Sequence, residues 1–76
     1  MKLIDGIMGD TYHVEVIDLP VQTERRLQAL GMTEGTSVTV MNKKKRGAMV
    51  IKVRGTRFAV GKHIAEHIHI EEVQGR

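Results

Sequence analysis

The sequence contains no cysteine and no tryptophan, and its aromatic residues are Tyr12 and Phe58. Without thiols the chain can form neither a disulfide framework nor a thiolate metal site, which fits a reducing compartment. At 76 residues it is expected to form one domain, residues 1–76, that buries only about 60% of its unfolded surface. The core must therefore be built mainly from aliphatic side chains.

Long hydrophobic runs are also missing. No stretch approaches the roughly 20 apolar residues that a membrane-spanning helix requires. The first residues include Asp5 and Gly6, where a signal peptide would need an unbroken apolar run. The sequence therefore predicts a soluble, cytoplasmic protein, which would be held at the inner face of a membrane only through a partner.

Catalytic patterns are absent from the sequence as well. Its glycines are scattered and match neither a P-loop nor a dinucleotide-binding fingerprint. Ser37, the single serine, falls within an expected strand and outside any nucleophile motif. Glu71 and Glu72 are adjacent and would point to opposite faces of a strand, so they make a poor carboxylate pair. We predict that the protein is not an enzyme and binds no cofactor.

Most of the region from residue 11 to residue 73 alternates apolar and polar side chains with a period of two, which is typical of strands. Five strands are expected, near residues 12–16, 36–41, 48–54, 57–60 and 68–71. Their inward-facing residues are predicted to be Tyr12, Val14, Val16, Val38, Val40, Met49, Ile51, Val53, Phe58, Val60, Ile68 and Ile70. The last residues, 74–76, are expected to form a frayed tail.

Residues 24–30 are nearly all good helix formers and predict one short helix after the first strand. Thr23 is the expected N-cap, and Leu27 and Leu30 the expected buried side. Gly31 would supply a left-handed cap, and the methionine that follows it would fold back toward Leu27. This helix is the one clear interruption of the strand pattern.

The remaining segments read as tight connections. Residues 42–47 predict a polar, cationic hairpin tip, and Gly55-Thr56 a two-residue type II′ turn. Residues 62–67 could form a single helical turn before the last strand. Together these elements predict an all-β protein: a small SH3-like barrel of about five strands, with an inserted helix. A five-stranded OB-type barrel is the main alternative.

Cationic residues provide the first candidate interaction site. The formal net charge is +3, and Lys43, Lys44, Lys45 and Arg46 are consecutive. The run could be a solvated hairpin tip, a phosphate contact, or a contact to an acidic protein patch or anionic lipid. Stacking aromatic residues, which single-strand nucleic-acid binders add to charge, do not accompany it. The helix could extend the positive surface through Arg25 and Arg26.

Methionines and histidines give two further candidates. Met32, Met41 and Met49 are expected in or near the core, although a partly exposed Met32 could serve as an apolar docking anchor. His63 and His67 are four residues apart, the spacing that stacks two imidazoles on one helix face, and His69 follows. We hypothesise weak transition-metal binding there, which a triple His→Ala variant with unchanged affinity would disprove; no defined metal site is assigned.

The order of these features resembles the FeoA family. One part of the resemblance is ERRLQALGMTEGTSVTV, residues 24–40, with its Arg-Leu, its Leu-Gly followed by an apolar residue, and a glycine before a valine-rich strand. The other part is VRGTRFAVG, residues 53–61, followed by Ile64-Ala65 and the strand at 68–70. The resemblance covers roughly residues 3–73. Lys62 stands where an arginine is common, and the histidines match no shared motif.

This resemblance implies an SH3-like barrel and a role in iron homeostasis. The implied function is that of a non-enzymatic adaptor of the FeoB ferrous iron transporter, which carries a cytoplasmic GTP-binding domain, acting by protein–protein contact. Related barrels also occur in iron-dependent repressors, but these carry a helix-turn-helix domain for which the chain has no room. The alternative function is a small RNA- or ribosome-binding barrel. Weak self-association is a further expectation that the sequence leaves open.

Overall fold

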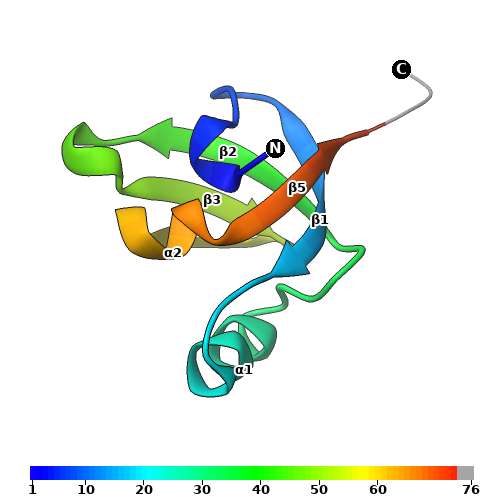
Figure 1. Cartoon of the computed structure of the whole chain (residues 1–76). Coiled ribbons are helices and arrows are strands. Elements are labelled where there is room, and N and C mark those ends of the chain that lie inside the picture. Colours follow the sequence, from blue (N-terminus) through cyan, green and yellow to red (C-terminus); the bar gives the residue numbers. More distant parts are fainter. Residues whose placement is uncertain (74–76) are drawn as a thin grey trace.

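The computed structural model describes residues 1–73, so the tail expected at 74–76 lies outside the described residues. The chain begins with a short 3-10 turn, η1, and continues as a mainly β structure with two helices (Figure 1). The elements in chain order are η1 (Leu3–Asp5), β1 (Thr11–Ile17), α1 (Val21–Ala29), β2 (Ser37–Lys43), η2 (Lys45–Gly47), β3 (Met49–Val53), β4 (Thr56–Val60), α2 (Lys62–Glu66) and β5 (Ile68–Glu72).

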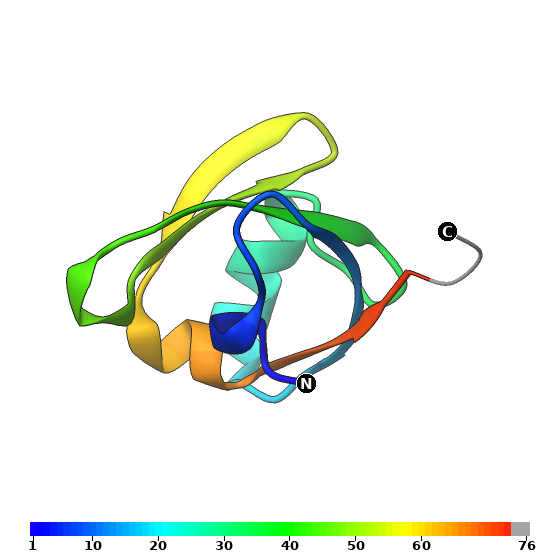
Figure 2. The same cartoon turned by 90° about the horizontal axis from the view of Figure 1, so that it is seen from above.

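The strands form one antiparallel sheet in the order β4-β3-β2-β1-β5. The sheet curls around the core, and η1 lies across its open end beside β5 (Figures 1 and 2). The predicted all-β class, with an inserted helix and a helical turn before the last strand, is confirmed. The sheet is not closed into a barrel within residues 1–73, because the two end strands β4 and β5 do not pair with each other.

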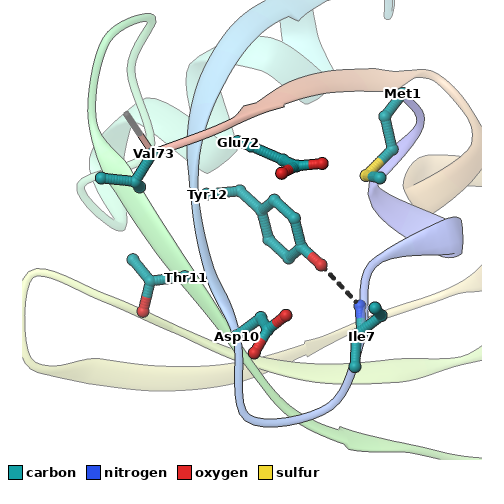
Figure 3. A pocket seen from close by; sticks show the side chains of 7 residues that line it. All are labelled: Met1, Ile7, Asp10, Thr11, Tyr12, Glu72 and Val73. Atoms are coloured by element: carbon teal, nitrogen blue, oxygen red, sulfur yellow. Dashed lines mark hydrogen bonds between the residues drawn. The ribbon is translucent and has the colours of Figure 1, made fainter. Parts of the chain in front are cut away.

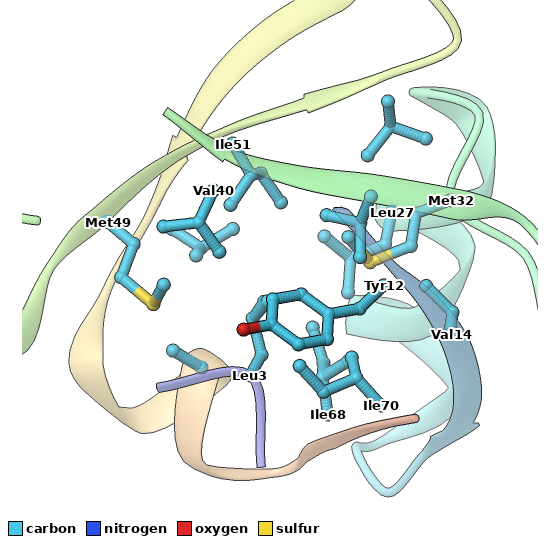
Figure 4. Close-up of a cluster of buried hydrophobic side chains, with 14 of the residues drawn as sticks. Leu3, Tyr12, Val14, Leu27, Met32, Val40, Met49, Ile51, Ile68 and Ile70 are labelled. Carbon is cyan, nitrogen blue, oxygen red and sulfur yellow. The ribbon is translucent and has the colours of Figure 1, made fainter. Parts of the chain in front are cut away.

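The core lies inside the curl of the sheet and is mainly aliphatic, as the composition requires (Figure 4). Every strand contributes to it, and so do η1 and α1. The fully enclosed side chains include Leu3, Met32, Val38, Val40, Met49, Ile51, Val53, Ala65 and Ile68, each 0% exposed. Burying such side chains is worth about 1.5–3 kcal/mol each, which makes this cluster the main source of stability.

The inward alternation predicted for the first strand is wrong at its end. Tyr12 and Val14 are buried, but Val16 is 44% exposed and Ile17 is 7% exposed. The pairing of β1 with β5 shifts register between Val14 and Val16. Because a bulge adds one residue to one strand, it moves the following side chains to the opposite face.

Helix α1 starts earlier than the propensities suggested. Pro20 occupies the N-cap position and Val21 is the first helical residue, so Thr23 lies inside the helix and does not cap it. Leu27 is buried as predicted, whereas Leu30, at the C-cap, is 42% exposed. The predicted left-handed residue is confirmed at Gly31, which has φ +100°.

The β3–β4 connection also differs from its prediction. Its central residues are Arg54 and Gly55, with φ values of 51° and 82°, and Val53 pairs with Thr56. Two central residues with positive φ define a type I′ turn, which begins one residue earlier than the predicted type II′ turn. The sequence did not indicate this turn, because a residue other than glycine, such as Arg54, rarely adopts a left-handed backbone conformation.

Candidate functional site

The cationic run forms the end of β2 and the loop that leads to β3. Lys43 is the last residue of β2, and η2 contains Lys45 and Arg46; all four cations of the run are exposed. The backbone N–H of Lys44 donates to the carbonyl of Ala48 over 2.8 Å and closes the loop. The structure therefore presents these charges on a tight and fully exposed hairpin tip, as the sequence predicted; we call residues 43–46 the cationic loop.

Lys43 differs from the rest of the cationic loop in having a partner. Its Nζ atom donates to the backbone carbonyl of Gly6 over 3.0 Å, which ties the loop to the segment after η1. Gly6 itself is buried, and a Cβ at this position would come within 2.9 Å of Val40. Lys43 thus supports the loop from its base, while the other three cations extend into solvent.

Lys62 at the start of α2 adds a cation that the sequence did not assign to this site. A Cβ built on Gly47 would lie 2.7 Å from Cγ of Lys62, so the stem of this lysine covers the glycine. Lys62 is itself exposed. Lys62 follows Arg46, the last residue of the loop, by 16 positions in the chain, and only the packing of α2 beside η2 brings the two charges together.

The helix residues predicted for the site lie elsewhere. Arg25 and Arg26 are exposed on α1. Figure 1 places α1 at the lower end of the molecule and the cationic loop, coloured green, at its upper left. Figure 2 also shows the two elements apart. The structure thus gives two separate positive areas and does not join them into one surface.

Met32 is not available as a docking anchor. Its side chain is 0% exposed and belongs to the core cluster. Apolar side chains near α1 that do reach solvent are Val16, Val21 and Leu30, which are 44%, 60% and 42% exposed. Sequence periodicity could not find them, because two of these three were predicted to be buried.

Of the three candidate histidines, His63 and His67 are in contact, and His69 lies on a different element. The ring centroids of His63 and His67 are 4.5 Å apart, and Nδ1 of His67 is hydrogen-bonded to the backbone carbonyl of His63 at 2.8 Å. His69 lies on β5, where it pairs with Val16 and Lys2. Within residues 1–73 no group of three or more His, Cys, Asp or Glu side chains is arranged to hold a metal ion.

A surface hollow of about 310 Å³ lies between the N-terminal segment, the start of β1 and the end of β5 (Figure 3). Tyr12 forms its inner wall, and the phenol oxygen accepts a hydrogen bond from the Ile7 N–H at 2.9 Å. Asp10 and Glu72 add two carboxylates to a lining that is about equally polar and apolar. None of the predicted site residues lines this hollow. Sequence reasoning missed it, because β1, β5 and the N-terminal segment meet there only in the folded chain. The full lining is Met1, Ile7, Asp10, Thr11, Tyr12, Glu72 and Val73.

The charged side chains of residues 1–73 lie at the surface or only partly buried. Among the described residues no polar or charged side chain is buried. Neither α1 nor α2, the two α-helices of residues 1–73, has the length and hydropathy of a membrane-spanning helix. The described residues present exposed positive charge on a curled antiparallel sheet.

Comparisons with known proteins agree with the resemblance seen in the sequence. A family model described as FeoA domain matches residues 1–72. The solution structure of the FeoA protein from Chlorobium tepidum has a TM-score of 0.91 and 25% identity, and the match covers 100% of this chain and 73% of that chain. The crystal structure of an iron uptake regulatory protein (FeoA) has a TM-score of 0.83 and 27% identity, with 96% of each chain covered.

A manganese-dependent transcriptional repressor is also similar, with a TM-score of 0.86 and 20% identity over 96% of this chain and 41% of the repressor. At that identity the similarity concerns the fold alone. No curated protein matches the sequence at significant similarity. The shared architecture confirms the predicted SH3-like fold class, although the sheet is open.

Proposed function

The chain belongs to the FeoA family, and on this premise we propose that it is a non-enzymatic cytoplasmic adaptor that regulates ferrous iron uptake by binding a FeoB-type transporter. The observation that carries the proposal is the cationic loop, extended by Lys62 across Gly47. In this proposal the loop binds an acidic patch on the cytoplasmic side of the transporter. Arg25 and Arg26 on α1 provide a second, separate contact area.

The loop is suited to electrostatic recognition. Exposed charges steer a partner during its approach and select against like-charged surfaces, while contributing less to the final affinity. The loop is anchored at its base by the contact from Lys43 to Gly6 and closed by the contact from Lys44 to Ala48. A preorganised loop loses little conformational entropy on binding.

A protein partner is favoured over a nucleic acid by the placement of the aromatic residues. Tyr12 is 3% exposed, and Phe58 is partly buried against the core. Tyr12 therefore cannot stack on an unpaired base and Phe58 exposes only part of its ring, whereas most single-strand binders add such stacking to charge. RNA binding would therefore depend mainly on phosphate contacts and would weaken steeply with salt.

The test is a titration of the ¹⁵N-labelled protein with the cytoplasmic domain of a FeoB transporter at physiological salt. We expect saturable chemical-shift changes at residues 44–46 and at Lys62. Reversing two charges in the K44E/K45E variant should weaken binding at least about tenfold, equivalent to about 1.4 kcal/mol.

The matched control is the K52E/R57E variant, which changes the net charge equally but carries its substitutions on the β3–β4 hairpin. It should bind the transporter domain as the parent does. Equal loss in both variants would reduce the effect to net charge, and undiminished binding by K44E/K45E would remove the loop from the interface. No binding by the parent, together with saturable binding of structured RNA, would favour the alternative function.

A further inference from the structure

The free edge of the sheet is the starting point of a second inference, which is independent of the cationic loop. Strand β5 has its outer edge partly covered, because Lys2 bridges to His69 and the Ile70 N–H donates to the carbonyl of Met1 over 2.7 Å. Strand β4 pairs with β3 and, within residues 1–73, with no strand on its other side. In Figure 2 the yellow β3–β4 hairpin forms the upper boundary of the molecule.

The register shows which backbone groups this edge offers. Val53 and Thr56 flank a two-residue turn, and in such hairpins the flanking residues form a hydrogen-bonded pair. Because hydrogen-bonded and non-hydrogen-bonded pairs alternate in an antiparallel ladder, Arg57 and Ala59 direct their N–H and C=O groups away from β3. Both residues are exposed, so two sets of backbone donors and acceptors face outward at the spacing of a strand.

The side chains along this edge carry an unusual charge arrangement. Lys52 on β3 lies directly opposite Arg57 on β4, and both are exposed. Like charges directly opposite each other destabilise a strand pair. Arg54 in the turn adds a third exposed cation nearby.

No acid balances these cations on the same face of the hairpin. Strand β2 places Thr39 beside Lys52, and the same-face neighbours along β3 and β4 include Val50 and Ala59. No side-chain hydrogen bond found in residues 1–73 involves Lys52, Arg54 or Arg57. Positive charge and unpaired backbone groups therefore coincide on one edge.

We propose that the outer edge of β4 binds an extended acidic segment of a partner protein, which adds to the sheet as a further strand. The segment would pair its backbone with Arg57 and Ala59. Side chains alternate along a strand, so carboxylates at every second position would lie on the face that carries Arg57 and Lys52. Their charge would relieve the repulsion between these two cations.

A peptide fits this edge better than a nucleic acid does. Recognition through backbone N–H and C=O groups requires a partner with the same groups at the same spacing. Phe58, the aromatic residue of β4, pairs with Ile51 and packs partly buried against the core, so it presents little surface for base stacking. Exposed cations can also serve only to discourage edge pairing, and in that case the edge would bind no acidic strand.

The experiment is a titration of the ¹⁵N-labelled full chain with a short peptide of alternating glutamate and valine. We expect saturable shifts at Arg57 and Ala59. Hydrogen exchange at these two amides should slow in the complex, whereas the Phe58 amide, already bonded to β3, should not change. The K52E/R57E variant should lose affinity about tenfold or more, equivalent to at least about 1.4 kcal/mol.

Two further variants separate the edge from other surfaces. Ala59→Pro removes an outward-facing N–H but no hydrogen bond to β3, so it should abolish the shifts and keep the folded spectrum. K44E/K45E, in the cationic loop, should bind the peptide nearly as the parent does. If Ala59→Pro does not fold, the exchange measurement on the parent decides.

Several results would overturn the inference. These are the absence of saturable shifts, shifts centred on the cationic loop, equal binding of a lysine–valine peptide, or unchanged affinity in K52E/R57E. Displacement of the peptide by single-stranded RNA, with protection of no β4 amide, would show that the edge cations recognise phosphate and not a strand.

Discussion

The backbone N–H of Met32 donates to the carbonyl of Leu27 over 2.9 Å, across the end of helix α1. Together with the bond from the Gly31 N–H to the carbonyl of Gln28, also 2.9 Å, it forms a Schellman motif. The side chains of the two residues, Met32 and Leu27, are 0% and 4% exposed, respectively. The end of the helix and the core are therefore specified by the same few residues, with Gly31 between them.

Gly31→Ala should destabilise the protein by about 1–2 kcal/mol, because an L-residue is strained in the left-handed region. Gly35→Ala is the matched control, since Gly35 has φ +87° and open space around its Cβ position. At Gly31 the new methyl group meets Cδ of Arg54 at 3.2 Å, but that exposed side chain can move. Urea unfolding should give similar losses for both variants. A neutral Gly35→Ala would contradict the strain argument.

Met32→Ala should cost about 2–5 kcal/mol, because it opens a cavity in the core. That is a large part of the stability of a small domain, about 5–15 kcal/mol. Met41 is only partly buried and lies at the register shift between Val40 and Asn42, so Met41→Ala should cost less than about 1 kcal/mol. Thermal or urea unfolding distinguishes the two. Similar losses would mean that Met32 is not the core residue that its burial indicates.

Ile17→Ala should cost about 2–5 kcal/mol, and Val16→Ala should change stability by less than about 0.5 kcal/mol. The bulge in β1 buries Ile17 and exposes Val16, which reverses the order expected from strict alternation. Denaturant unfolding of both variants provides the measurement. If Val16→Ala were the more damaging change, the strand would continue without a bulge.

Tyr12→Phe should cost about 0.5–1.5 kcal/mol, because it removes the oxygen that accepts the Ile7 N–H while leaving the ring in the core. Hydrogen exchange at the Ile7 amide should accelerate, and amides within β3 should respond only through the global loss of stability. An unchanged rate at Ile7 would show that the hydrogen bond does not form in solution.

The strands that alternate strictly were predictable from the sequence. Met49, Ile51 and Val53 are all 0% exposed, as expected, because a period of two places every second residue on one face. The left-handed conformation of Gly31 was equally predictable, since glycine after a short helical run commonly forms its cap. Both signals are local, so neighbouring residues contain the whole of the information.

The irregular positions were not predictable in the same way. The bulge beside Val16 depends on how β1 pairs with β5, which lies about 50 residues later in the chain. The N-terminus of α1 lies three residues before the predicted helix start, and the type I′ turn at Arg54-Gly55 begins one residue before the predicted turn. In these places tertiary packing outweighs preferences worth less than about 1 kcal/mol per residue.

For the candidate sites, too, local features were predictable from the sequence and long-range relationships were not. The sequence by itself determined the all-β class, the aliphatic core and the exposure of residues 43–46, because composition and local pattern carry those properties. Only the tertiary structure decided that Lys62 joins the cationic loop, that α1 lies apart from it, and that Lys52 faces Arg57 on an open edge. These relationships arise from strand register and sheet curvature, which depend on contacts between residues far apart in the chain.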